Sequence, residues 1–133
     1  MTHGQDIIFV VDNDLAVRES LRFALELEGL TVRPCGSGAE LLRHPDLPHG
    51  RCVVMECNMP LMDGFEVLDF LAARRATLPA ILLTSYASAT LRRRAATVGV
   101  RYVLEKPILN GSLLERIQEV LGHDRQITPA LLE

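Results

Sequence analysis

Two acids, a hydroxyl and a lysine stand at or just beyond the ends of four short apolar runs of the sequence: Asp12, Glu56, Thr84 and Lys106. Carboxylates are hard oxygen ligands for Mg²⁺, a lysine ammonium is a point charge for phosphoryl oxygens, and a threonine hydroxyl donates a hydrogen bond to them. Each residue alone is as often a helix cap or a solvated turn. Their occurrence together favours one shared site that holds a divalent cation and a phosphoryl group.

The segments that carry these residues alternate between two hydrophobic patterns. Short β-branched runs predict strands at 7–11, 30–33, 52–55, 80–84 and 101–104, and three- and four-residue apolar spacing predicts helices between 14 and 29 and at 37–43, 64–74, 88–98 and 112–121. Asp14 is the expected N-cap of the first helix. Because each crossover is then a helix, the pattern predicts an α/β fold with a parallel sheet, whose ligands bind at the carboxyl ends of the strands.

Length and composition predict one cytoplasmic domain. The chain has 133 residues, 48% of them apolar, a formal net charge of −3, and ordinary glycine and proline counts, which argue against disordered or fibrous classes. No run approaches the roughly 20 apolar residues that a membrane span needs. Cys35, Cys52 and Cys57 form an odd set without a CxxC pair, which is typical of a reducing compartment, and we interpret them as core residues.

The charges are unevenly distributed. Residues 70–104 contain six arginines and no acidic residue, and three of the arginines are consecutive: Arg92, Arg93 and Arg94. Consecutive residues point about 100° apart on a helix, so these three cannot form one flat patch, and most such runs are solvated faces. With Arg101 nearby, a contact with an acidic partner is the competing interpretation.

The segment Glu56–Gly64 (ECNMPLMDG) carries the most specific signal. With Thr84, Tyr102 and the pair Lys106-Pro107, it resembles the receiver domains of two-component response regulators over residues 6–121. The resemblance implies a doubly wound (βα)5, flavodoxin-like fold with parallel strand order 2-1-3-4-5, a cis bond before Pro107, and a non-enzymatic role in signalling. It makes 1–121 a receiver domain and 122–133 a C-terminal tail or a truncated linker to an output domain.

Two departures from the family pattern fall on its chemistry. Glu56 occupies the position of the phosphoacceptor aspartate, and Asn13 occupies the second position of the acidic pair. By resemblance, Mg²⁺ would be held by Asp12, Glu56 and the backbone carbonyl of Asn58, with Asn13 at a degenerate ligand position, so we expect weakened binding. The extra methylene of glutamate moves its oxygens about 1.5 Å further into the pocket, and a misplacement near 1 Å can reduce a rate by about a hundredfold.

Three consequences of Glu56 remain open. Its carboxylate could pair with Lys106 and accept from Thr84 without phosphorylation, which would bias the domain towards an active arrangement. A carboxylate has one negative charge and two oxygens, whereas a phosphoryl group carries nearly two charges and three oxygens. The second interpretation is therefore an inert receiver. The third is an ordinary receiver in a histidine-kinase phosphorelay with glutamate as an unusual acceptor.

The resemblance also implies where partners bind. In receivers the fourth helix, fifth strand and fifth helix form the surface that responds to the switch, and here it includes Arg92, Arg93, Arg94, Arg101 and Tyr102. The expected partner is a sensor histidine kinase or another signalling protein, or a second copy of the chain. The tail 125–133 resembles the start of a LuxR-type helix-turn-helix, so DNA would be contacted only through a missing output domain.

Other classes fit fewer of these residues. Asp12 and Asp14 resemble the acid pair of haloacid-dehalogenase-type phosphatases, but that interpretation leaves the Met-Pro loop unexplained. A flavodoxin-like cofactor site needs a phosphate cradle where this sequence has acids. Metal binding through His44, His49 and Cys52 matches no usual ligand spacing.

Overall fold

The computed structural model describes residues 6–122 of the chain. Its strands are β1 (Ile7–Val11), β2 (Thr31–Cys35), β3 (Gly50–Glu56), β4 (Ala80–Thr84) and β5 (Tyr102–Glu105). Its α-helices are α1 (Leu15–Leu27), α2 (Gly38–Leu42), α3 (Gly64–Ala73), α4 (Ala89–Thr97) and α5 (Asn110–Leu121), and a 3-10 turn, η2, spans Leu47–His49. The predicted alternation of strands and helices is confirmed.

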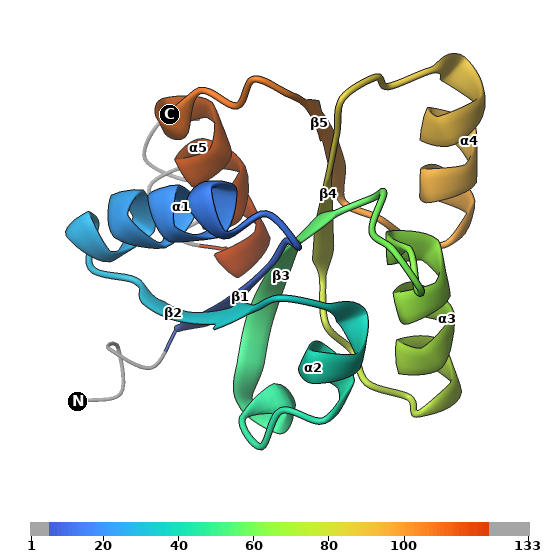
Figure 1. Cartoon of the computed structure of the whole chain (residues 1–133), viewed down its shortest axis with the longest axis horizontal. Coiled ribbons are helices and arrows are strands. Elements are labelled where there is room, and N and C mark those ends of the chain that lie inside the picture. Colours follow the sequence, from blue (N-terminus) through green and yellow to red (C-terminus); the bar gives the residue numbers. More distant parts are fainter. Residues whose placement is uncertain (1–5, 123–133) are drawn as a thin grey trace, which may run out of the picture.

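The strands form one parallel sheet in the order β2-β1-β3-β4-β5. Helices α1 and α5 cover one face of this sheet, and α2, α3 and α4 cover the other (Figure 1). This is the doubly wound order that the receiver resemblance implied. Because all five strands run in the same direction, their carboxyl ends meet at one edge.

Local signals in the sequence explain where the helices begin. The Asp14 side chain caps α1 by accepting from two backbone amides, as predicted, and Ser37 and Ser88 cap α2 and α4. Asp63 and Glu66 form a reciprocal capping box at the start of α3. These caps fix the helix N-termini beside the carboxyl ends of the strands, which is the edge that carries the site.

The second strand extends further than predicted because of its place in the sheet. The prediction ended at residue 33, before Pro34, whereas β2 continues through Pro34 to Cys35. Proline lacks an N–H for the ladder and is tolerated on edge strands. β2 is such an edge, since it pairs only with β1.

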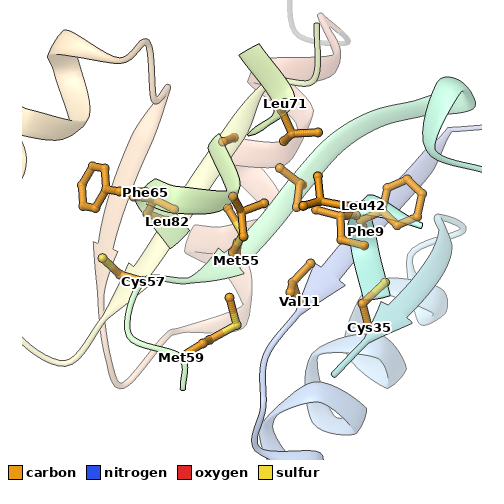
Figure 2. Close-up of a cluster of buried hydrophobic side chains, with 14 of the residues drawn as sticks. Phe9, Val11, Cys35, Leu42, Met55, Cys57, Met59, Phe65, Leu71 and Leu82 are labelled. Carbon is orange, nitrogen blue, oxygen red and sulfur yellow. The ribbon is translucent and has the colours of Figure 1, made fainter. Parts of the chain in front are cut away.

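Two apolar layers hold the helices to the sheet. One lies under α2, α3 and α4 and is built on Phe9, Met55 and Leu82, with Phe65 at its outer side, away from Phe9 (Figure 2). The other lies under α1 and α5 and includes Ile8. All three cysteines are buried and free, which confirms their interpretation as core residues.

Candidate functional site

Lys106 joins the two buried acids at the carboxyl edge of the sheet. Its ammonium Nζ lies 2.5 Å from Glu56 Oε1 and 3.4 Å from Asp12 Oδ2. Asp12 is 1% exposed and Glu56 is 5% exposed. Three of the four residues predicted to share one site therefore meet at one point, although up to 94 positions separate them in the chain.

The turn after β1 holds Asp12 in place. Its Oδ1 atom accepts from the backbone N–H of Asp14 at 2.8 Å, and its backbone carbonyl accepts from the Arg18 guanidinium at 2.7 Å. The Asp14 carboxylate is occupied as the cap of α1, accepting from Ala16 N and Val17 N. The phosphatase interpretation needs Asp14 as a second acid in the site, and its engagement as a helix cap gives that interpretation no support.

The loop after β3 fixes Glu56. The second carboxylate oxygen, Oε2, accepts from the backbone N–H of Asn58 at 2.9 Å. The loop then folds back, with the N–H of Gly64 donating to the carbonyl of Cys57 at 2.8 Å. A Cβ at Gly64 would lie 3.2 Å from both Cys57 Cα and the Glu56 carbonyl oxygen, so this close approach favours glycine.

Lys106 is held as a cation. Partial burial by itself would lower the pKa of its ammonium, but the contact with Glu56 and the charges of Asp12 and Glu56 together raise that pKa above its ordinary value. Its backbone N–H donates to the Thr84 carbonyl at 2.8 Å, and the Lys106-Pro107 bond is cis, as the resemblance implied. Among residues 6–122, Glu56 Oε1 has this ammonium beside it but no hydrogen bond of regular geometry.

Thr84 lies at the same edge, and its hydroxyl is bound within its own loop. It is 1% exposed, and its hydroxyl exchanges hydrogen bonds of 3.3 Å with the backbone carbonyl and N–H of Tyr86. Of the two contacts considered for Glu56, the structure contains the one with Lys106, whereas the Thr84 hydroxyl is directed to its own loop. The short distance along the chain between Thr84 and Tyr86 makes this local turn available.

The two carboxylates expected to hold Mg²⁺ already share the Lys106 cation. Among residues 6–122, no three histidine, cysteine, aspartate or glutamate side chains come together as a metal-ligand group. The expected ligands Asp12 and Glu56 share the Lys106 cation, and Asn13 is exposed and neutral. Because Mg²⁺ requires several hard oxygen ligands, a donor set of two carboxylates with an ammonium between them fits this ion poorly.

The alternative metal group also has no geometric support. Cys52 is buried within β3. His44 accepts from Asp46 N through Nδ1, and its ring packs edge-on against Phe9 at a centroid distance of 5.1 Å. In the described part of the chain, Cys52, His44 and His49 do not form a metal-ligand group.

Tyr102 lies half-buried on β5 and is tied to α5. Its hydroxyl donates to Glu119 at 2.6 Å, and the Arg116 guanidinium binds the same carboxylate oxygen at 2.5 Å while lying 5.2 Å from the centre of the tyrosine ring. The bond that the Tyr102 hydroxyl donates to Glu119 raises the pKa of Tyr102. The bonds that Glu119 accepts from Tyr102 and Arg116 lower the pKa of its carboxyl group.

The consecutive arginines of α4 point to three different neighbours. Arg92 donates to the Val103 carbonyl at 3.3 Å, Arg94 lies 4.0 Å from the centre of the Phe65 ring, and Arg93 donates to Thr90 on its own helix. Arg101 is exposed and directly precedes β5. The predicted spread around the helix is confirmed, and two of the three arginines attach α4 to the domain.

A shallow groove runs between α4 and β5. Its volume is about 250 Å³, and Arg92, Arg101 and Tyr102 are among the residues that line it. Three of the five residues predicted for a partner surface therefore border one groove.

Several residues around the site were not singled out from the sequence. Arg18 fixes the Asp12 carbonyl, Arg116 and Glu119 hold Tyr102, and Glu105 binds the backbone N–H of Ala87 at 2.9 Å. Of these residues, only Glu105 could have been noticed from the sequence, because it directly precedes the candidate site residue Lys106. The others act across elements, and their spacing along the chain gives no indication of the contact.

A doubly wound parallel sheet with an acid pair and a lysine at its carboxyl edge defines a class of signalling domain. The model of the response regulator receiver domain matches residues 8–118. The chain belongs to this family, whose members are signalling domains of two-component systems. Receiver domains signal and are not enzymes in their own right.

Curated relatives include transcriptional regulators. The transcriptional regulatory protein FixJ of Azorhizobium caulinodans is 35% identical over 120 residues, which cover 90% of this chain and 56% of that protein. An uncharacterized 14.6 kDa protein of Leptolyngbya boryana is 38% identical over 122 residues, covering 89% of this chain and 92% of that protein. The chain spans little more than half the length of the FixJ proteins it matches.

Solved structures agree with the fold. The crystal structure of FixJ-N has a TM-score of 0.79 at 28% identity and covers 89% of this chain and 94% of its own. The chemotaxis protein CheY4 of Vibrio cholerae has a TM-score of 0.81 at 25% identity and covers 87% of this chain and 98% of its own. In the described part of the chain, no helix is both long and apolar enough to cross a membrane.

Proposed function

We propose that this chain is an atypical receiver that signals by protein contact without being phosphorylated. The observation that carries the proposal is the ion pair between Glu56 Oε1 and Lys106 Nζ, which is 2.5 Å long and partly withdrawn from solvent. Glu56 stands where the family has its phosphoacceptor, and its negative charge already faces the lysine that a phosphoryl group would meet. Thr84 at the end of β4 and Tyr102 at the start of β5 are the proposed switch residues.

Phosphoryl transfer to Glu56 meets two obstacles. Both carboxylate oxygens are engaged, one by Lys106 and the other by Asn58 N, so in-line attack requires breaking a contact first. Asn13 is neutral, so it adds no negative charge to help bind the cation that would neutralise the incoming phosphoryl group. Because positioning and charge neutralisation supply most of the catalysis of this transfer, both obstacles slow it.

Mg²⁺ binding is proposed to be weak. When bound, Mg²⁺ supplies charge neutralisation for phosphoryl oxygens. Asp12, Glu56 and the carbonyl of Asn58 are the groups that would hold it. Lys106 lies between the two carboxylates and competes for them, so we expect the ion to bind far more weakly than in a receiver with a complete acidic pair.

Incubation with acetyl phosphate and Mg²⁺, followed by intact-mass measurement, tests the proposal. We expect no phosphorylated species for the natural protein and a phosphorylated species for Glu56→Asp, which restores the usual carboxylate position. Glu56→Gln is the matched control that keeps the volume of the side chain but has no nucleophile. A stable phosphoryl adduct on Glu56 of the natural protein would overturn the proposal in favour of an ordinary phosphorelay receiver.

The partner is proposed to be a protein with an acidic surface, a sensor histidine kinase or another signalling protein. Arg93 of α4 and Arg101, directly before β5, are exposed, and their side chains make no hydrogen bond or ion pair with another element among residues 6–122. Arg101 also borders the groove between α4 and β5. A homodimer through α4, β5 and α5 is the alternative, and sedimentation of Arg93→Glu/Arg101→Glu tests it. Loss of self-association supports a homodimer, and an unchanged monomer supports a separate partner.

The wider setting follows from the relatives. We propose a cytoplasmic protein in which residues 1–121 are the receiver and 122–133 are a tail or linker. Beyond Gly122 this segment lies outside the described residues. Since two FixJ relatives are named as transcriptional regulatory proteins and are longer than this chain, DNA would be contacted only through an output domain beyond these residues.

A further inference from the structure

Helix α4 is anchored by little apolar burial. Ala95 is its one buried residue, whereas α3 buries Gly64, Phe65, Val67 and Leu71. Figure 1 shows α4 at the outer side of the domain, following the loop that leaves β4. An element with few buried apolar side chains opens locally at low free energy unless polar contacts hold it.

Three polar contacts join α4 and its preceding loop to other elements. Arg92 reaches the Val103 carbonyl, Arg94 lies over Phe65, and the Glu105 carboxylate accepts from the backbone N–H of Ala87 at 2.9 Å. The bond from Ala87 holds the loop itself, two residues before α4 begins. Thr84 exchanges bonds of 3.3 Å with Tyr86 inside this loop, and Ser88 caps α4 by accepting from Leu91 N–H at 3.0 Å, so neither joins the loop to β5.

Glu105 is also the direct neighbour of Lys106. The two side chains leave the end of β5 towards different groups, Glu105 to Ala87 and Lys106 to Glu56 and Asp12. The backbone N–H of Lys106 donates to the Thr84 carbonyl, which fixes the ends of β4 and β5 together. A shift of the Lys106 backbone therefore moves the group that holds the loop before α4.

We propose that Glu105 is a positioning residue that latches the loop between β4 and α4 and couples this loop to the Glu56–Lys106 pair. The latch itself depends only on the bond with Ala87. The coupling rests on the proposed function, because it treats the ion pair as the element that sets the position of Lys106. This route runs through the end of β5 and does not use the Thr84 hydroxyl.

Amide hydrogen exchange of the full chain, resolved to the segment 85–91, tests the latch. Glu105→Ala removes a charged acceptor, so we expect exchange in this segment to become about tenfold faster. Glu105→Gln keeps an acceptor oxygen and should restore much of the protection. Glu115→Ala is the matched control, because Glu115 is exposed on α5 and its side chain has no hydrogen bond or ion pair within residues 6–122.

A double-mutant comparison tests the coupling. Glu56→Gln removes the charge that holds Lys106, and we expect exchange in 85–91 to rise about threefold when Glu105 is present and to stay unchanged in the Glu105→Ala background. If Glu56→Gln changes exchange in 85–91 equally with and without Glu105, the proposed coupling is wrong. If Glu105→Ala by itself leaves exchange in 85–91 unchanged, the proposed latch is wrong. Both results are independent of the phosphorylation assay, so failure of the latch is distinguishable from failure of the proposed function.

Discussion

The ammonium of Lys106 meets the carboxylate of Glu56 at 2.5 Å, and this ion pair lies at the carboxyl edge of the parallel sheet. The pair is partly withdrawn from solvent, with the Lys106 side chain 25% exposed and that of Glu56 7% exposed. Removal of one partner from such a pair leaves an uncompensated charge, which costs more than removal of both.

Lys106→Met therefore should destabilise the domain by about 2 kcal/mol, less than a fully buried pair because water reaches the lysine. Glu56→Gln in the same chain should recover at least half of that loss, since the carboxylate left without its cation is then neutral. Urea unfolding of both single variants and the double variant measures the coupling. Additive losses would contradict an energetic link between the two side chains.

Alkaline pH should lower the stability. Burial raises the pKa of Cys35 and Cys52 from 9.0 to about 12, so the unfolded chain loses these protons first, and the stability they contribute falls as pH rises from about 9 towards 12. Lys106 also has a raised pKa, so its contribution is complete below its ordinary value of 10.5 and is lost above that. Urea unfolding between pH 8 and pH 11 measures the decline, with a Cys35→Ala/Cys52→Ala variant expected to show a smaller one.

The titration of Tyr102 should depend on Glu119. The bond that the tyrosine hydroxyl donates to this carboxylate raises the pKa of Tyr102, so Glu119→Gln should shift its ionisation to lower pH. Ultraviolet absorbance of tyrosinate in a Tyr86→Phe background reports Tyr102 alone. An identical titration curve with and without the Glu119 carboxylate would show that Tyr102 is not tied to α5 in solution.

Gly38 should not tolerate a side chain. A Cβ at this position would overlap Val67 Cγ2, where α2 packs on α3. We expect Gly38→Ala to cost about 1–3 kcal/mol through overpacking, and Val67→Ala in the same chain to relieve part of that loss. Thermal unfolding of the two single variants and the double variant measures this. Gly111→Ala is the control, because a Cβ there meets no atom within 4 Å.

The sequence predicted the elements well because the pattern signals are local. The apolar run Ile7–Val11 predicts a buried strand from its own residues alone. Asp14 likewise caps the helix that follows by accepting from backbone amides two and three residues away. The predicted end of β2 was wrong, because a strand can include Pro34 only where it lies at the edge of the sheet, as β2 does. That position is a property of the whole topology.

The candidate site divides in the same way. The residue types and their places after the strands predicted that Asp12, Glu56 and Lys106 would meet, because the carboxyl ends of parallel strands share one edge. Whether Glu56 would also receive the Thr84 hydroxyl depended on competing partners, and a local turn with Tyr86 binds that hydroxyl. The directions of Arg92 and Arg94 depended likewise on the neighbours that lie beside α4.

The sequence alone predicted an α/β receiver and, by resemblance, a glutamate at the phosphoacceptor position. The hydrophobic periodicity, the helix caps and the loop motif each involve residues that are close together along the chain, so they can be recognised without a structure. The assembled fold was needed to show that Lys106 lies against Glu56, that Glu119 holds Tyr102, and that Glu105 accepts a bond from the loop before α4. These contacts join residues far apart in the chain, and they follow from distances that arise only when the sheet is assembled.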